Sequence, residues 1–235
     1  MQKSKRMSLL RTFIKEHKDV KIKELSEQID VSESTIRRDI KDLVKEGFVR
    51  EYYGSVVLLE KNQTDTWIDE RLNSKVEEKS YIGQLAAEQI DDDDFVFIDA
   101  GTTTFHMIKS IKAKNITVVT NGINVASELV KYGIDTRMLA GKLKATTMAI
   151  VGEEAILQLM QYHFDVCFIG ANGLNKDGYN TPDLKEGLVK KTVIHQSSRT
   201  YILADSSKEN VDSAFTFAKL EEGKWINELS KEVME

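Results

Sequence analysis

The chain has 235 residues, of which 41% are hydrophobic and 30% charged, and its formal net charge is −5. This length supports one small domain and one domain of about 150–180 residues with a substantial core. The sequence has no apolar run as long as a membrane span, no secretory signal and a single cysteine, Cys167, so we expect a cytoplasmic protein without internal disulfides or membrane contacts.

The first predicted elements are three short helices that share one small core. Apolar residues recur at helical spacing near residues 9–14, 22–29 and 31–44. Asp30 or Ser32 can cap the third helix with a side-chain oxygen. Residues 48–59 then predict two strands around a Gly-containing turn. Together these elements predict a winged helix-turn-helix.

The third helix has the composition of a DNA recognition helix. Its apolar residues can dock on the core while short hydroxyls and basic side chains stay outside. The candidate DNA contacts are Ser34, Thr35, Arg37, Arg38 and Lys41. Two adjacent arginines could be only a solvated charged face. However, residues 1–54 hold 13 Lys/Arg against 10 Asp/Glu, whereas residues 55–235 hold 20 against 28, and this separation favours DNA binding by the first module.

Composition and periodicity divide the chain into a DNA-binding domain at 1–59, a polar linker at 60–66 and a larger domain at 67–235. Helical periodicity from residue 67 ends at Asp91–Asp94, which we interpret as a solvated loop. Short apolar runs then alternate with helical segments, and this alternation predicts a mostly parallel α/β sheet covered on both faces. The predicted strands lie at 95–100, 116–120, 136–140, 165–171 and 199–205.

Polar residues follow each predicted strand, at the edge where α/β sheets bind ligands. Gly101 and the three threonines after it can surround a phosphate at a helix start, although threonines also cap helices without a ligand. Carboxylates and amides at this edge could orient hydroxyls of a polyol or serve as local caps. The candidate effector contacts are Asp99, Gly101, Thr102, Thr103, Thr104, Asn121, Lys142, Glu186, Asp205 and Lys208.

Four motifs together resemble one known family: Ser34–Asp39, Asp99–Thr104, Val119–Asn121 and Ala204–Lys208. They are similar to motifs of the DeoR family of bacterial sugar-metabolism repressors, and the resemblance extends over nearly the whole chain. It implies an amino-terminal winged helix-turn-helix that binds operator DNA. It also implies a carboxyl-terminal α/β sensor domain that is similar to sugar-phosphate isomerases and binds a phosphorylated sugar.

Members serving fructose, lactose or tagatose phosphotransferase pathways are the nearest type. By resemblance, Thr102 to Thr104 hold the phosphate, and Gly141 joins the residues around the sugar.

The sequence departs from the family pattern in three places. The wing has Tyr53-Gly54 where two glycines are usual, and Ala140-Gly141 stands where paired glycines are usual. Family members commonly end on a further strand that finishes in an aspartate, whereas this chain runs through Trp225 into a charged finish. We therefore expect a terminal sheet edge that differs or is incomplete.

These observations predict a non-enzymatic repressor of a sugar-utilisation operon, with no cofactor, whose complex with double-stranded operator DNA is released by a sugar phosphate. A single winged module contacts few base pairs, so we expect a homo-oligomer, either a dimer or a tetramer. The sequence leaves open which arginine reads a base and which sugar phosphate binds.

The main alternative is a sugar-phosphate isomerase or deaminase-like enzyme. Such an enzyme would use Glu186, Asp205 or His195 as its base, although no spacing identifies that arrangement. A protein-binding adaptor, as a third class, predicts neither the basic helix nor the polar strand ends.

Overall fold

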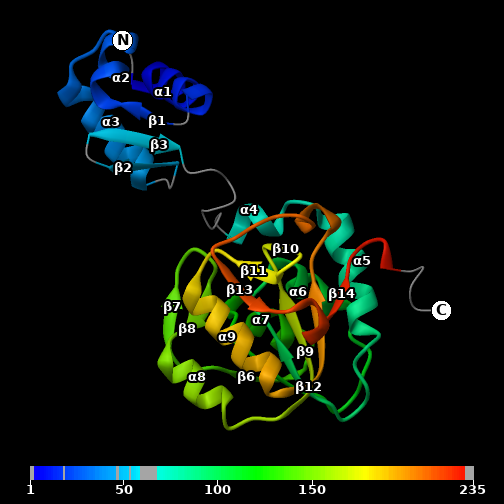
Figure 1. Cartoon of the computed structure of the whole chain (residues 1–235). Helices are drawn as coiled ribbons and strands as arrows, with labels where there is room; N and C mark the ends of the chain where they lie inside the picture. The colour runs from blue at the N-terminus through cyan, green and yellow to red at the C-terminus, as the bar shows by residue number, and fades with distance from the viewer. Residues whose placement is uncertain (1–2, 18, 46–47, 53, 59–67, 231–235) are drawn as a thin grey trace. The chain divides into compact units, whose positions relative to one another are not determined.

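The computed structural model describes residues 3–17, 19–45, 48–52, 54–58 and 68–230 (Figure 1). The chain forms two compact units, Met1–Thr64 and Asp65–Glu235. The linker that we predict at 60–66 lies outside the described residues.

The first unit is a three-helix bundle with a small antiparallel sheet in the order β1-β3-β2. Its elements are α1 (Lys3–His17), β1 (Asp19–Lys21), α2 (Ile22–Ile29), α3 (Glu33–Lys45), β2 (Val49–Tyr52) and β3 (Ser55–Leu58). The winged helix-turn-helix prediction is confirmed. Strand β1 is additional, because three residues are too few to show a strand periodicity in sequence.

The core of this unit includes Leu10, Ile36, Ile40 and Leu43, which are fully buried. The inner side of α3 also carries a charge, because Asp39 is only 1% exposed. Arg6 of α1 donates two hydrogen bonds to its carboxylate, at 2.5 Å and 3.2 Å. This ion pair joins α3 to α1.

The second unit contains a six-stranded sheet in the order β14-β12-β9-β4-β5-β6, in which all neighbouring strands are parallel. Its strands are β4 (Phe95–Ile98), β5 (Thr117–Thr120), β6 (Asp135–Met138), β9 (Phe164–Gly170), β12 (Ser197–Leu203) and β14 (Lys224–Ile226). Its helices are α4 (Ile68–Leu72), α5 (Val76–Ala87), α6 (Thr102–Met107), α7 (Ile123–Lys131), α8 (Glu153–Leu159) and α9 (Leu184–His195). The predicted parallel α/β architecture is confirmed.

Two smaller sheets and three short 3-10 helices complete this unit. Hairpin β7 (Lys142–Lys144) with β8 (Ala149–Val151) forms one of the two sheets. The other comprises β10 (Gly173–Asn175), β11 (Gly178–Thr181) and β13 (Phe215–Ala218). The 3-10 helices are η1 (Ile108–Ser110), η2 (Ser206–Lys208) and η3 (Leu220–Glu222).

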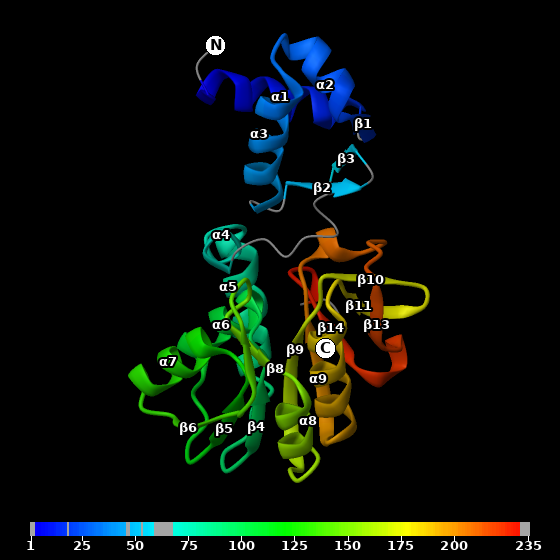
Figure 2. The ribbon, with the colours of Figure 1, turned by 90° about the vertical axis from the view of Figure 1, so that its left-hand side faces the viewer.

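Helices cover both faces of the large sheet, as Figure 2 shows. Alternate side chains of each strand enter opposite cores: Phe97 packs with residues of α8 and α9, whereas Ile98 packs with residues of α5, α6 and α7. Strands that are buried on both faces appear in sequence as continuous apolar runs, which is why these strands were predictable.

Two sequence expectations need correction. The sheet edge near the carboxyl terminus is not incomplete, because Lys224, Trp225 and Ile226 form β14 beside β12. The edge does differ, since Asn227 follows β14 where the family pattern has an aspartate. The expected solvated loop at Asp91–Asp94 is solvated only in part. Asp94 is buried, and its carboxylate accepts a hydrogen bond of 2.8 Å from Arg199.

Strand order reverses between β4 and β9, at the centre of the sheet. Following the chain, β4 leads to β5 and β6 on one side, whereas β9 leads to β12 and β14 on the other. The carboxyl ends of strands diverge at such a point, and the resulting crevice is the usual ligand site of open α/β sheets.

Candidate functional site

The outward face of α3 carries the predicted DNA contacts. The side chains of Ser34, Arg37, Arg38 and Lys41 are exposed, and Thr35 is half-buried. The helix starts at a cluster of hydroxyls, because Ser32 Oγ lies 3.0 Å from both Ser34 Oγ and Thr35 Oγ1. The face therefore presents hydroxyls at its amino end and cations along its length.

The two adjacent arginines differ in their partners. Arg37 lies 3.2 Å from a carboxylate oxygen of Glu51 on β2 and 3.6 Å from one of Glu33. Arg38 has no polar partner among the described residues. Its charge is therefore less compensated than that of Arg37.

The second unit has a cavity at the point where the strand order reverses. Its volume is about 20 Å³. It is lined by Arg71, Asp99, Ala100, Gly101, Asn121, Thr147, Ala149, Gly170, Asn172, Glu186 and Lys190. Four of the predicted effector residues, Asp99, Gly101, Asn121 and Glu186, therefore meet here.

A buried ion pair forms one side of this cavity. Lys190 of α9 lies 2.5 Å from Asp99 Oδ2, and the two residues are 6% and 2% exposed. Gly170 completes the arrangement, since its amide donates to Asp99 at 3.1 Å and its carbonyl accepts from Lys190 at 3.0 Å. Glycine at position 170 leaves room for this arrangement, because a Cβ there would lie only 3.3 Å from Asp99 Oδ2.

Glu186 enters the cavity from the first turn of α9. Its carboxylate accepts a 2.5 Å hydrogen bond from Thr147, and Lys144 lies 3.3 Å away. Lys144 also lies 2.9 Å from Asp183, the residue that caps α9. Burial alone would raise the pKa of Asp183, but hydrogen bonds from the Glu186 amide and from Lys144 lower it.

Asn121 has a structural use in addition to its place in the lining. Its side chain accepts a 3.0 Å hydrogen bond from the Ala100 amide and donates to the Ile150 carbonyl at 3.3 Å. It thereby joins the end of β4 to β8.

The three threonines after Gly101 are buried in α6 rather than lining the cavity. They are 3%, 8% and 0% exposed in chain order. The Thr104 hydroxyl donates to the carbonyls of Asp99 and Gly101, at 2.7 Å each. The phosphate-holding role of Thr102, Thr103 and Thr104 stays a prediction.

Gly141 and Lys142 also lie outside the lining. Gly141 has a φ of 139°, and a Cβ there would meet the Val151 carbonyl at 2.9 Å, so the turn itself requires glycine. Lys142 is exposed at the start of β7. Their effector contacts stay predictions.

Asp205 and Lys208 lie in a second group of charges near Arg71. Asp205 is 3% exposed and accepts a 2.5 Å hydrogen bond from Lys75. Burial alone would raise the Asp205 pKa, but hydrogen bonds from Lys75 and Ser207 lower it. We call Arg71, Lys75, Lys79 and Lys208 the cation cluster.

The pKa values of two members of the cation cluster are lowered. Burial, together with the charge of Arg71, lowers the pKa of Lys79 to about 8. Burial is also the main cause that lowers the pKa of Lys208, and Arg71 and Lys75 contribute. Cations that destabilise one another in this way would be stabilised by a bound anion.

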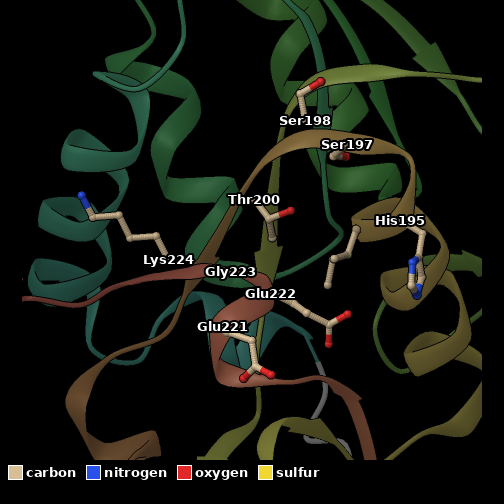
Figure 3. A pocket seen from close by; sticks show the side chains of 9 residues that line it. His195, Ser197, Ser198, Thr200, Glu221, Glu222, Gly223 and Lys224 are labelled. Atoms are coloured by element: carbon tan, nitrogen blue, oxygen red, sulfur yellow. The ribbon is translucent and has the colours of Figure 1, made fainter.

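A larger hollow of about 500 Å³ lies at the opposite end of β12 (Figure 3). It is shallow, open to solvent and lined by side chains such as His195, Ser198, Glu221 and Glu222. His195 and Glu186 are nine positions apart on α9, or roughly 13 Å along the axis. His195 therefore does not share a site with the cavity residues.

Seven residues of the cavity lining were not among the predicted effector contacts, and four of them are polar: Arg71, Thr147, Asn172 and Lys190. Lys190 had a usable signal, because it follows Glu186 by four positions and so lies on the same helix face. Arg71 and Thr147 had none, since Arg71 lies in the five-residue helix α4 and Thr147 in a turn, and the position of both segments depends on the fold.

Within the described ranges, no three His, Cys, Asp or Glu residues are grouped so that they could hold a metal ion. The helices of these ranges are also too short or too polar to cross a membrane.

Comparison with known proteins assigns both units. Residues 6–62 match the family described as DeoR-like helix-turn-helix domain, and residues 74–227 match the DeoR C terminal sensor domain. The chain is 37% identical over 215 residues to the "Uncharacterized HTH-type transcriptional regulator FruR" of Bacillus subtilis, covering 91% of this chain and 86% of that protein. It is 26% identical over 227 residues to the "Lactose phosphotransferase system repressor" of Streptococcus mutans, covering 94% and 89%.

Among solved structures, the chain is similar to ribose 5-phosphate isomerase from Plasmodium falciparum. The TM-score is 0.41 at 17% identity, and the match covers 56% of this chain and 52% of that one.

Proposed function

Because this chain belongs to the DeoR family of transcriptional regulators, we propose that it represses a sugar-utilisation operon and releases its operator when a sugar phosphate binds the second unit. The name of the Streptococcus mutans relative supports both repression and a phosphotransferase sugar. The relatives are named as regulators, which supports a non-enzymatic role. As a DNA-binding regulator, the protein would act in the cytoplasm.

The observation that carries this proposal is the cation cluster beside the cavity. Arg71 belongs to both, so a phosphate at Arg71 would leave the sugar among Asp99, Asn121 and Glu186. Carboxylates and amides are suitable partners for sugar hydroxyls. We propose Arg71 and Lys208 as phosphate contacts, with the amides near Gly101 contributing.

On the DNA side, we propose that Arg38 and Lys41 supply the main contacts of α3, while Ser34, Thr35 and Arg37 adjust the approach to the groove. One winged module contacts few base pairs, so at least a dimer is needed for specific binding.

The test is a titration of hexose phosphates against the full-length protein on its own upstream DNA. Fluorescence anisotropy follows dissociation, and chromatography of the sugar follows chemical conversion. We expect one phosphorylated hexose to weaken DNA binding about 5- to 150-fold without being converted. The unphosphorylated sugar and inorganic phosphate are the matched controls, and neither should release the DNA at that concentration.

Conversion of a sugar phosphate by a protein that forms no DNA complex would overturn the proposal in favour of the enzyme. Release by the unphosphorylated sugar alone would contradict the role of the cation cluster.

A further inference from the structure

The cavity is too small for the ligand that we propose. Its volume of about 20 Å³ is enough for about one water molecule. Sites for small molecules usually measure about 300–1,000 Å³. A sugar phosphate can therefore enter only if part of the wall moves.

The strand-end side of the wall is fixed by many hydrogen bonds. Asp99 bonds to Lys190 and to the Gly170 amide, and these groups are buried. Asn121 bonds to Ala100 and Ile150 on neighbouring strands. Moving this side would break these buried hydrogen bonds.

Another part of the lining comes from the short helix α4, which contributes Arg71. The Ile68 amide donates a 3.0 Å hydrogen bond to the Thr146 carbonyl. At the other end of α4, Lys79 donates a hydrogen bond to the carbonyl of Arg71. The Nε2 atom of His106 lies 3.2 Å from the carbonyl oxygen of Leu72. The Ile68–Thr146 bond therefore ties the start of α4 to residues 144–148.

Residues 144–148, which we call the 144–148 turn, contact the cavity as well as α4. Thr147 lines the cavity and donates to Glu186, and Lys144 pairs with the same carboxylate. Met148 has a φ of 50°, a left-handed conformation that is unfavourable for a residue with a side chain. The 144–148 turn therefore has some backbone strain, and it contacts both α4 and the side chains that line the cavity.

We propose that the effector enters by separating α4 from the 144–148 turn, and that this separation is the signal sent to the DNA-binding unit. The inference rests on the proposed function. Helix α4 is suited to the task because Arg71 lines the cavity from it and because Ile68 follows the predicted linker at 60–66 closely in the sequence.

The test locks α4 to the turn with a disulfide, using Ile68→Cys together with Thr146→Cys. Residues joined by a backbone hydrogen bond lie within the roughly 4–7 Å between Cα atoms that a disulfide spans. The native Cys167 is fully buried, and burial raises its pKa to about 11, so it does not compete for oxidation. Neither substituted residue lines the cavity.

We expect the oxidised double variant to bind its upstream DNA as the unmodified protein does. It should need at least about tenfold more of the releasing hexose phosphate, and its affinity for that sugar should fall by a similar factor, because both require the separation that the disulfide prevents. Reduction with dithiothreitol should restore both values. The two single-cysteine variants, which cannot cross-link, are the matched controls.

Equal release of the oxidised and reduced forms would overturn the inference. Loss of DNA binding in the oxidised form alone would also overturn it, since the closed cavity would then not belong to the DNA-bound state. Failure of the proposed function looks different, because the unmodified protein would then not respond to any hexose phosphate.

Discussion

The outward face of α3 and the lining of the cavity use the same residue types in opposite physical states. Arg38 and Lys41 on α3 are exposed and have no polar partner among the described residues. Asp99 and Lys190 in the cavity are almost completely buried and hydrogen-bonded to each other. An exposed charge is stabilised by water and needs no partner, whereas a buried charge loses its hydration and must be paired.

This difference teaches where function and stability are linked. On α3, the groups proposed to bind DNA contribute little to the folded state. In the cavity, the groups proposed to bind the sugar also hold strands and helices together. Substitutions on the outward face of α3 should therefore change only the affinity for DNA. Many substitutions in the cavity should change the free energy of unfolding as well as the affinity for the effector.

The largest expected effect is that of Lys190→Met. It leaves the Asp99 carboxylate buried without its cation, so we expect the second unit to lose about 3–5 kcal/mol of unfolding free energy. Both tryptophans, Trp67 and Trp225, belong to this unit, so tryptophan fluorescence during urea unfolding measures it. The double variant with Asp99→Asn should recover part of the loss. A loss below about 1 kcal/mol would mean that the pair behaves like a surface ion pair.

Arg71→Gln is the cavity substitution that should separate binding from stability. Its guanidinium has no partner among the described residues, so the unfolding free energy should change by less than about 0.5 kcal/mol. Losing a charge-assisted contact with phosphate should weaken effector binding by about 1.5–3 kcal/mol, measured by isothermal titration calorimetry. Lys185→Gln, which removes an exposed charge outside the cavity, is the control. Unchanged affinity in the Arg71 variant would remove Arg71 from the site.

The two arginines of α3 offer a test within the DNA-binding face. We expect Arg38→Ala to weaken operator binding by about 1–3 kcal/mol and Arg37→Ala to weaken it less, because Glu33 and Glu51 already compensate Arg37. Thermal unfolding should be unchanged in both variants. Fluorescence anisotropy at several salt concentrations measures the affinity and the number of phosphate contacts. A larger loss of operator affinity in the Arg37 variant would mean that Arg37 supplies the main DNA contact in place of Arg38.

The smallest expected effect is a dependence of effector affinity on pH. Lys79, whose pKa is lowered to about 8, loses its positive charge as the pH rises from 7 to 9. A bound phosphate dianion raises this pKa, so binding takes up protons and the affinity should fall a few-fold over that range. Calorimetry in buffers of different ionisation enthalpy measures the uptake. In the Lys79→Met variant the uptake should decrease, and an unchanged uptake would assign it to another group.

Local patterns were sufficient to predict α3 and the main strands. The spacing of Ile36, Ile40 and Leu43 identifies the buried side of α3 and therefore its outward face. The strands of the large sheet other than β14 appear as apolar runs because both faces of the sheet are covered. Strand β14 and the two small sheets were missed, and four of these six strands have only three residues, too few to show a pattern.

Three of the four predicted cavity residues follow a strand, and Glu186 of α9 is the exception. Asp99 and Asn121 each follow a strand, and the sheet topology brings them together. Arg71 and Thr147 reach the cavity through packing of segments that are distant in sequence, and no local pattern records such packing. The burial of Thr102 to Thr104 was likewise invisible, because it depends on how α6 lies against its neighbours.

The buried pair of Asp39 and Arg6 limits how this regulator can lose its operator. Rotating α3 about its own axis would pull a buried carboxylate away from the guanidinium that neutralises it, at a penalty larger than a sugar can readily supply. We therefore expect the DNA-binding unit to keep its internal arrangement. If the protein binds its operator as the dimer that we propose, an effector would act by changing where the two units stand along the double helix.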